Sequence, residues 1–144
     1  MDKNKFNKSN FSTAPYVKKI EKPWGYELHW VTSNKPYMGK LLHLNKGARF
    51  SLQYHEQKLE SWFLIKGEAK ITFDDEIGNL METVMEKEKG YACVPGQRHR
   101  IFGITDCDVI EVSTPETGTT YRLEDDYNRP DETVEQRKKE RGEK

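Results

Sequence analysis

Short runs in which apolar and polar residues alternate recur through the middle of the chain, and turn-forming residues separate them. Residues 27–31 (ELHWV) alternate as a half-buried strand does. Gly67, Gly90 and Asp106 are among the breaks. Many short strands with turn signals at intervals of roughly 8–12 residues predict an all-β sandwich or barrel. The expected strands cover residues 27–31, 37–44, 50–55, 61–66, 69–73, 81–85, 91–94, 99–104 and 108–113.

The two ends of the chain do not follow this pattern. Residues 1–19 are rich in lysine and asparagine, and we expect a flexible arm there. The alternative is a strand swapped onto a partner subunit, because Phe6, Phe11 and Tyr16 are costly to leave in water. Residues 130–144 are almost wholly charged, and we expect a disordered tail rather than the alternative, a polar helix with Glu–Lys pairs. The compact domain is therefore expected to cover residues 20–129, with loop and room for one more strand after residue 115.

Composition narrows the classes of function. A chain of 144 residues is the size of one domain. Its formal net charge is zero, so charge does not favour binding to nucleic acid or to an anionic membrane. No apolar run approaches the roughly 18–20 residues of a membrane span, and the N-terminus lacks the apolar core of a signal peptide. Cys93 and Cys107 are too few for a disulfide framework, and we expect free thiols in a cytoplasmic protein.

Four polar side chains lie in two turn-bounded segments and suggest a metal site. Gln53 and His55 are two residues apart in an expected strand, so they project from the same face. Glu60 begins the next strand after a short loop, and His99 follows the turn at 95–96. Imidazole nitrogens, a carboxylate and an amide oxygen suit zinc, and also manganese, iron, cobalt or nickel. We therefore predict a divalent metal, zinc first, held by these four residues.

The same positions carry a resemblance to a known superfamily. Gly47, Gln53, His55, Glu60 and Gly67 resemble the first cupin motif, with Gln53 at the place of the usual first histidine. The segment 90–103 resembles the second motif through its proline, glycine and histidine. It is one residue shorter before the proline, and it ends on glycine where asparagine is common. The resemblance implies a double-stranded β-helix, the cupin jelly-roll barrel, with flexible charged termini.

A narrower resemblance covers roughly residues 20–129. The chain looks like the small cupins of the type II mannose-6-phosphate isomerase group, which also supplies the C-terminal domain of bifunctional mannose-1-phosphate guanylyltransferases. Glutamine at position 53 is part of that group's pattern. The chain departs from it at Gln57, where histidine is usual, and at Lys58, where arginine is usual. The segments that carry the resemblance are KPWGYE at 22–27, SLQYH at 51–55, HRI at 99–101 and RLEDDYNR at 122–129.

Three further side chains are candidates for catalysis. Lys58 lies two residues before Glu60 and could hold a substrate phosphate or move a proton. Glu111 lies among apolar residues in a strand, either on the solvent face or as a pocket carboxylate. Arg100 is similar in the family, but strand alternation points it away from His99. Lys40, Arg49, Arg122 and Arg129 are additional cationic candidates, for which a solvated surface position is at least as good an interpretation.

These observations leave three classes of function open. The first is a metal-dependent isomerase that converts an aldose phosphate to a ketose phosphate through an enediolate. The second is a metal-dependent dioxygenase or lyase, and the third is a non-catalytic cupin that binds a sugar or another metabolite. The expected partners are a small molecule, such as a sugar phosphate or related carbohydrate, and a second copy of the chain in a homodimer paired through edge strands.

Overall fold

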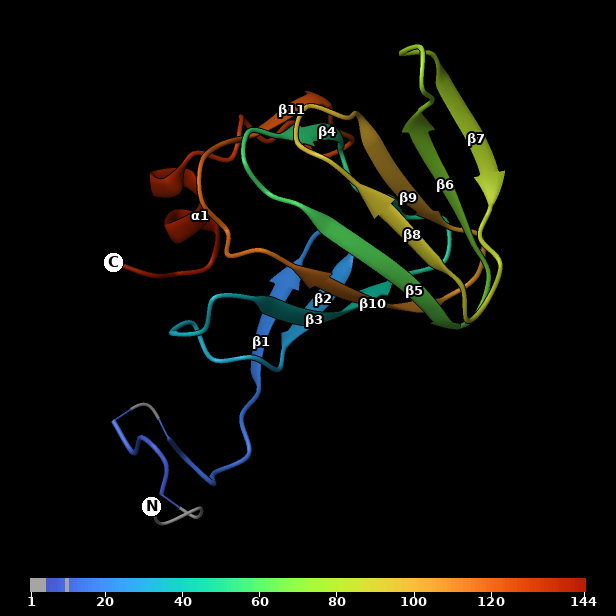
Figure 1. Cartoon of the computed structure of the whole chain (residues 1–144). Coiled ribbons are helices and arrows are strands. Elements are labelled where there is room, and N and C mark those ends of the chain that lie inside the picture. The colour runs from blue at the N-terminus through green and yellow to red at the C-terminus, as the bar shows by residue number, and fades with distance from the viewer. Residues whose placement is uncertain (1–4, 10) are drawn as a thin grey trace.

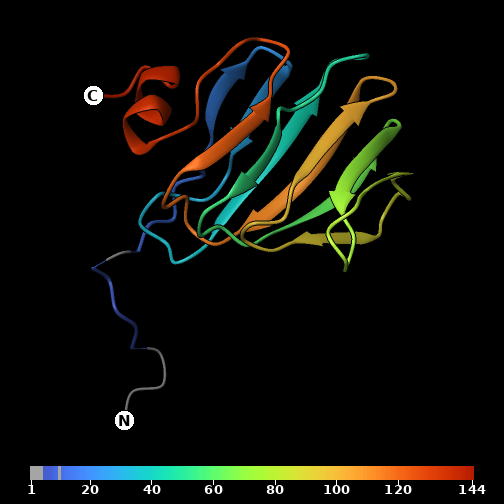
Figure 2. The same cartoon turned by 90° about the horizontal axis from the view of Figure 1, so that it is seen from above.

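The structure, a computed structural model, describes residues 5–9 and 11–144 and consists of two antiparallel β-sheets packed face to face (Figures 1 and 2). One sheet has the strand order β1-β2-β3-β10-β5-β8 and the other β11-β4-β9-β6-β7. The all-β prediction is confirmed. The strands are β1 (Lys18–Lys22), β2 (Gly25–His29), β3 (Met38–Leu44), β4 (Leu52–His55), β5 (Glu60–Lys66), β6 (Ala69–Asp74), β7 (Leu80–Val84), β8 (Gly90–Cys93), β9 (His99–Gly103), β10 (Cys107–Ser113) and β11 (Thr120–Glu124).

The core follows from the alternation of side chains along the strands. In β10 every second residue is buried, and this inward set contains Val109 and Glu111. In β5 the inward set contains Glu60, Trp62 and Leu64. Apolar side chains fill one part of the space between the sheets, while charged side chains occupy another part. The alternation of side chains along the strands therefore places both the apolar core residues and the charged residues on the inner faces of the sheets.

Strand register brings the inward-facing polar residues of the two sheets together. Because β10 lies between β3 and β5, Glu111 is paired with Lys40 on one side and with Trp62 on the other. In the second sheet, Gln53 of β4 is the direct partner of His99 of β9. Residues that are far apart in the sequence thus become neighbours on the inner faces of the barrel.

The N-terminal region differs from the expected layout at one point. Residues 18–22 form β1, which pairs with β2, although the sequence pattern placed them in the arm and the following turn. The segment KKIEK has one apolar residue, Ile20, which is buried, so it carried almost no alternation signal. Before β1 the described residues contain no strand, and Phe6, Phe11 and Tyr16 are exposed. Flexibility of this arm stays a prediction, and residues 1–4 and 10 lie outside the described residues.

The C-terminal segment adopts the helical alternative instead of the expected disordered tail. Helix α1 (Val134–Glu140) begins after Thr133, whose side-chain oxygen accepts a hydrogen bond from the backbone N–H of Gln136. The helix covers one end of the two sheets (Figures 1 and 2). Arg137 on its inner side is buried and ion-paired with Glu132 at 2.9 Å. Local composition hid this because part of the stabilisation comes from Glu116, which lies outside the segment and pairs with Arg137 and Arg141.

The helical content of the described chain is small. α1 has seven residues, all but one of them polar or charged. No helix among the described residues has the length and apolar character needed to cross a membrane.

Candidate metal centre and pocket

Three of the four predicted metal ligands meet between the sheets. His55 ends β4, Glu60 begins β5 and His99 begins β9. The Nε2 atoms of the two histidines lie 2.9 and 3.0 Å from Oε1 of Glu60. All three side chains are buried, and their potential ligand atoms lie within 4.8 Å of one another. Two imidazoles and a carboxylate directed at one point form a donor set that suits a divalent transition metal.

The outer nitrogens of both histidines are held by neighbouring groups. Nδ1 of His99 lies 2.9 Å from the carbonyl oxygen of Gln97 and 3.1 Å from Sγ of Cys93. Nδ1 of His55 lies 2.8 Å from Oγ1 of Thr120. Contacts of this kind fix the orientation of ligating imidazoles in metal sites. Here they aim both Nε2 atoms at Glu60.

The buried ring nitrogen of His99 is the test of fit for a metal. Its Nε2 atom is buried and makes no hydrogen bond with any described residue, although it lies 3.0 Å from Oε1 of Glu60. Burial lowers the pKa of His99, but Cys93 and Glu60 outweigh it and raise the pKa to about 10. Burial of an ionised ring without a well-made hydrogen bond is costly unless another group takes its place. A metal ion bound through Nε2 would replace that proton, so the residues fit the metal.

Gln53, the fourth predicted ligand, pairs with His99 on the neighbouring strand and lines a cavity together with His55 and Glu60. Its Oε1 atom accepts a hydrogen bond of 2.6 Å from Oγ of Ser51. The amide oxygen is therefore engaged by a group outside the cluster, and its role as a ligand stays a prediction.

Lys58 connects the metal cluster to a second carboxylate. Its Nζ atom lies 3.0 Å from Oε2 of Glu60 and 3.0 Å from Oε2 of Glu111, and all three side chains are buried. Burial and the nearby charge of Glu60 outweigh the attraction of Lys58 and raise the pKa of Glu111 to about 7. Glu111 and Glu60 in turn hold the pKa of Lys58 well above its usual value despite its burial. The site thus pairs a permanent cation with a carboxyl group that can exchange a proton near neutral pH.

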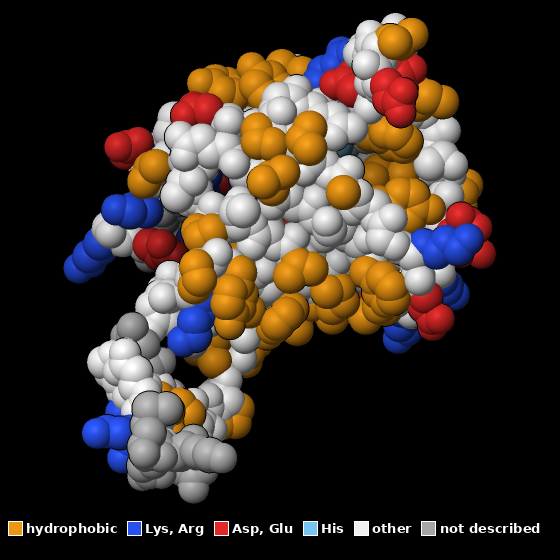
Figure 3. Space-filling model, viewed as in Figure 1, with side chains coloured by type: hydrophobic (Ala, Val, Ile, Leu, Met, Phe, Trp, Pro, Cys, Tyr) orange, Lys and Arg blue, Asp and Glu red, His pale blue; other side chains and the backbone are white. Residues whose placement is uncertain are grey.

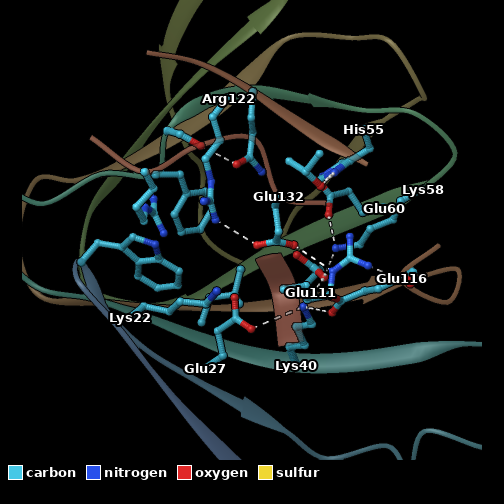
Figure 4. Close-up of a pocket in the computed structure, with 18 of the residues that line it drawn as sticks. Lys22, Glu27, Lys40, His55, Lys58, Glu60, Glu111, Glu116, Arg122 and Glu132 are labelled. Carbon is cyan, nitrogen blue, oxygen red and sulfur yellow. Dashed lines mark hydrogen bonds and ion pairs between the residues drawn. The ribbon is translucent and has the colours of Figure 1, made fainter. Parts of the chain in front are cut away.

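A cavity lies in front of these residues (Figure 4), with a volume of about 60 Å³. Ion pairs make up much of its lining, beside the apolar side chains of Trp24, Leu42 and Phe50. Lys40 contacts Glu116 and lies 3.4 Å from Glu27. Both carboxyl groups have pKa values well below the usual range, because lysines and arginines outweigh the effect of burial. The charged side chains that line the cavity are Lys22, Glu27, Lys40, Lys58, Glu60, Glu111, Glu116, Arg122, Arg129, Glu132, Arg137 and Arg141.

Arg100, a predicted catalytic residue, is not brought into this pocket. Its guanidinium donates to the carbonyl oxygen of Phe50 at 3.1 Å and pairs with Glu124 at 3.2 Å. Strand alternation from the inward-facing His99 turns it to the opposite side of β9. Arg49 likewise pairs with Asp126 outside the pocket.

Several pocket residues were missed by the sequence analysis. Glu27 had a detectable signal, because a charged residue at an inward position of an alternating strand must be paired. Glu116 follows Pro115 in a loop, and Arg137 and Arg141 belong to the charged C-terminal segment. Only their long-range contacts distinguish these three from surface charges.

A comparison with models of known families identifies the family of this chain. The model of the family described as mannose-6-phosphate isomerase C-terminal matches residues 9–132. The chain belongs to this family. The predicted resemblance is confirmed.

Curated members of this group are much longer proteins. The chain is 30% identical over 125 residues to the xanthan biosynthesis protein XanB of Xanthomonas campestris, covering 85% of this chain and 24% of that protein. It is 29% identical over 113 residues to the alginate biosynthesis protein AlgA of Pseudomonas aeruginosa, covering 76% of this chain and 21% of that protein. It is also 28% identical over 112 residues to the mannose-1-phosphate guanylyltransferase RfbM of Salmonella typhimurium, covering 76% and 21%. The chain spans less than a quarter of the length of these relatives.

Solved structures show the same fold at low identity. An oxalate decarboxylase of Lactobacillus farciminis in complex with formate superposes with a TM-score of 0.63 at 22% identity, covering 74% of this chain and 34% of that one. CapF with a bound inhibitor gives a TM-score of 0.62 at 17% identity, covering 76% and 34%. These proteins are cupins, and the double-stranded β-helix is confirmed as the fold.

The metal cluster predicts the effect of removing either histidine. His55→Ala and His99→Ala should each lose at least tenfold in zinc affinity, since each removes one of three converging ligands. Metal content of the purified variants, measured by mass spectrometry, checks this. His43→Ala is the matched control, because His43 pairs with Asp108 away from the cluster. Full metal stoichiometry in either site variant would refute the ligand set.

The buried ion pairs of Glu116 predict a loss of stability in acid. The pKa of Glu116 is lowered in the folded protein, so below a pH of about 4.5 the unfolded chain binds more protons and stability falls. Glu116→Gln should lower the free energy of unfolding at pH 7 by about 3 kcal/mol. It should also reduce the difference in stability between pH 7 and pH 4. Urea unfolding at both pH values measures this, and an unchanged difference in the variant would contradict it.

Proposed function

We propose that the chain is a metal-dependent sugar-phosphate isomerase of the mannose-6-phosphate type. The observation that carries this proposal is the pairing of Lys58 with both Glu60 and Glu111 at 3.0 Å. It places a group that can exchange a proton next to a candidate metal cluster. Membership in the mannose-6-phosphate isomerase C-terminal family supports the same activity.

The chemistry requires a proton to move between two neighbouring carbon atoms. A divalent metal, zinc first among the candidates, supplies Lewis acidity toward the substrate carbonyl when bound by His55, Glu60 and His99. Glu111 is the residue suited to take the proton from one carbon and return it to the next, since its pKa is about 7. Lys58 keeps its charge and can stabilise negative charge that develops on a substrate oxygen.

The pocket also favours an anionic ligand. Seven lysine and arginine side chains and five glutamates line it, so cations are in excess before any metal is counted. Figure 4 shows Lys22 and Arg122 across the cavity from His55 and Lys58. A negatively charged ligand would therefore face positive charge on both sides of the cavity.

A non-catalytic sugar-binding module is the second candidate. The observation that favours it is Lys58, which stands where arginine is usual in the resembled group, because a lysine cannot hold a phosphate through two parallel hydrogen bonds. In such a module the metal would serve structure or ligand capture. A dioxygenase or lyase remains an alternative without a supporting observation, because the likeness to oxalate decarboxylases is one of fold alone.

An assay of isomerase activity separates these candidates. The zinc-loaded protein should form fructose 6-phosphate from mannose 6-phosphate in a coupled assay. Glu111→Gln should lower kcat by a factor of about 10² to 10⁴, the usual contribution of a general base, while it retains its metal. Glu86→Gln, at an exposed loop position, should leave kcat unchanged.

The negative outcomes of that assay are equally clear. Absence of turnover with zinc, cobalt, manganese and nickel would favour the binding module. Oxygen-dependent turnover with iron would exclude the isomerase.

We also propose that the protein is a cytoplasmic homodimer. Buried free thiols at Cys93 and Cys107 support a reducing compartment. Phe63, Ile65 and Val112 are exposed on the outer face of β5 and β10. Figure 3 shows hydrophobic side chains gathered over this sheet, and exposed apolar patches of this kind mark association surfaces.

The dimer predicts a measurable mass. Sedimentation equilibrium should give twice the chain mass of 16.9 kDa at micromolar concentration. The double substitution of Phe63 and Val112 by lysine should shift the protein to the monomer, because it places charges in the apolar contact. Lysine at the exposed Glu86 is the control. A wild-type mass of one chain across the concentration range would exclude this interface.

A further inference from the structure

The C-terminal helix completes the wall of the pocket, although it lies outside the part of the chain that the family model matches. That match ends at residue 132, whereas α1 begins at Val134. Arg137 and Arg141 both line the cavity. The residues that hold the candidate metal and the residues that close the pocket therefore belong to different segments of the chain.

Both arginines converge on the carboxylate of Glu116. Nη2 of Arg141 lies 2.5 Å from Oε2 of Glu116, and Nε of Arg137 lies 3.4 Å from the same oxygen. Lys40 contacts the other oxygen, Oε1. Three cations are thus gathered around one carboxylate that comes from a loop.

Some cationic groups of this pocket keep unused hydrogen-bonding capacity. The Nε atoms of Arg122 and Arg141 are buried and have no hydrogen-bond partner among the described residues. Both arginines line the cavity. Buried donors without partners are rare in folded proteins and are a recognised sign of a missing ligand or ion. Of these donors, Nε of Arg141 belongs to the guanidinium that pairs with Glu116, so the position of that carboxylate is the one next to an unused donor.

The size of the cavity shows where a ligand must enter. Its volume of about 60 Å³ has room for a few water molecules, since each needs roughly 10–15 Å³. A larger ligand must displace a side chain, and displacement of most strand residues would break the core. Glu116 lies in a loop between β10 and β11, so it can leave without disturbing a strand.

We infer that Arg141, assisted by Arg137, binds the phosphate group of the ligand in the place now occupied by the Glu116 carboxylate. Residues 134–141 would then determine that the ligand is a phosphate monoester. This assignment rests on the proposed sugar-phosphate function and adds to it a specificity determinant outside the family-matched segment.

Phosphate fits this position better than a second carboxylate does. A guanidinium donates two parallel hydrogen bonds to phosphate oxygens, and Arg141 has its Nε donor available. Three cationic side chains gather at this position, so a dianion is attracted there more strongly than a monoanion. Glu116 acts as an internal competitor that keeps the three cations paired until phosphate replaces it.

Phosphate titrations of the full-length, zinc-loaded protein test this inference. The probes are inorganic phosphate and mannose 6-phosphate, with unphosphorylated mannose as the neutral comparison, measured by isothermal titration calorimetry. Arg141→Gln should weaken phosphate binding by about tenfold or more, because it removes a charge-assisted hydrogen bond. Affinity for zinc and for mannose should not change. Arg49→Gln is the matched control, since Arg49 also pairs with a carboxylate but outside the pocket.

A second variant separates ligand binding from a structural role of the helix. Glu116→Gln removes the competing charge and should tighten binding of inorganic phosphate by about tenfold. If the ion pair served only to fasten α1, Arg141→Gln and Glu116→Gln would weaken binding together. Arg141→Lys keeps the charge but loses the planar fork, so it should recover part of the affinity.

Two results would overturn the inference. One is wild-type phosphate affinity in Arg141→Gln, and the other is a joint loss of phosphate and zinc binding in that variant. None of these measurements requires turnover, so they are independent of the isomerase assay. If Arg141 binds phosphate but the protein has no isomerase activity, the proposed reaction is wrong and the inferred phosphate site still holds.

Discussion

Charges buried between two β-sheets must be paired, and this constraint shapes the centre of the molecule. Moving a carboxylate out of water costs several kcal/mol unless an opposite charge or hydrogen bonds compensate it. Glu60 illustrates the solution, since it faces two histidines and Lys58 at about 3 Å. Removal of any partner would leave an uncompensated charge in the interior. The geometry of the metal cluster is therefore tied to the geometry of the surrounding ion pairs.

The same constraint accounts for the chemical character of Glu111. It shares Lys58 with Glu60, so two buried carboxylates compete for one nearby cation, and the second cation, Lys40, is 3.9 Å away. Incomplete compensation raises the pKa of Glu111 to about 7, while its neighbours remain ionised. If every buried carboxylate in the barrel were fully paired with a cation, none of them would exchange a proton near neutral pH.

The sequence predicted much of the fold and the centre of the site. Strand alternation and glycine-marked turns indicated a β-barrel, and the spacing of His55, Glu60 and His99 indicated their convergence. It did not predict β1, whose single buried apolar residue carries little periodicity. It also could not show that α1 would form, because Arg137 and Arg141 both pair with Glu116, which lies in the loop between β10 and β11. Alternation of apolar and polar residues in the sequence indicates which side chains face inward. Ion pairs between distant segments can be identified only from the three-dimensional structure.

The position of α1 beyond the matched segment has an evolutionary consequence. Strands β4, β5 and β9 carry the candidate metal ligands and are constrained by register, burial and the core. Helix α1 is not part of either sheet, and it is held by ion pairs such as Arg137 with Glu132 and not by strand register. Insertion, loss or substitution in this helix could change the residues that line the pocket. The barrel and its candidate metal ligands could stay the same in related proteins.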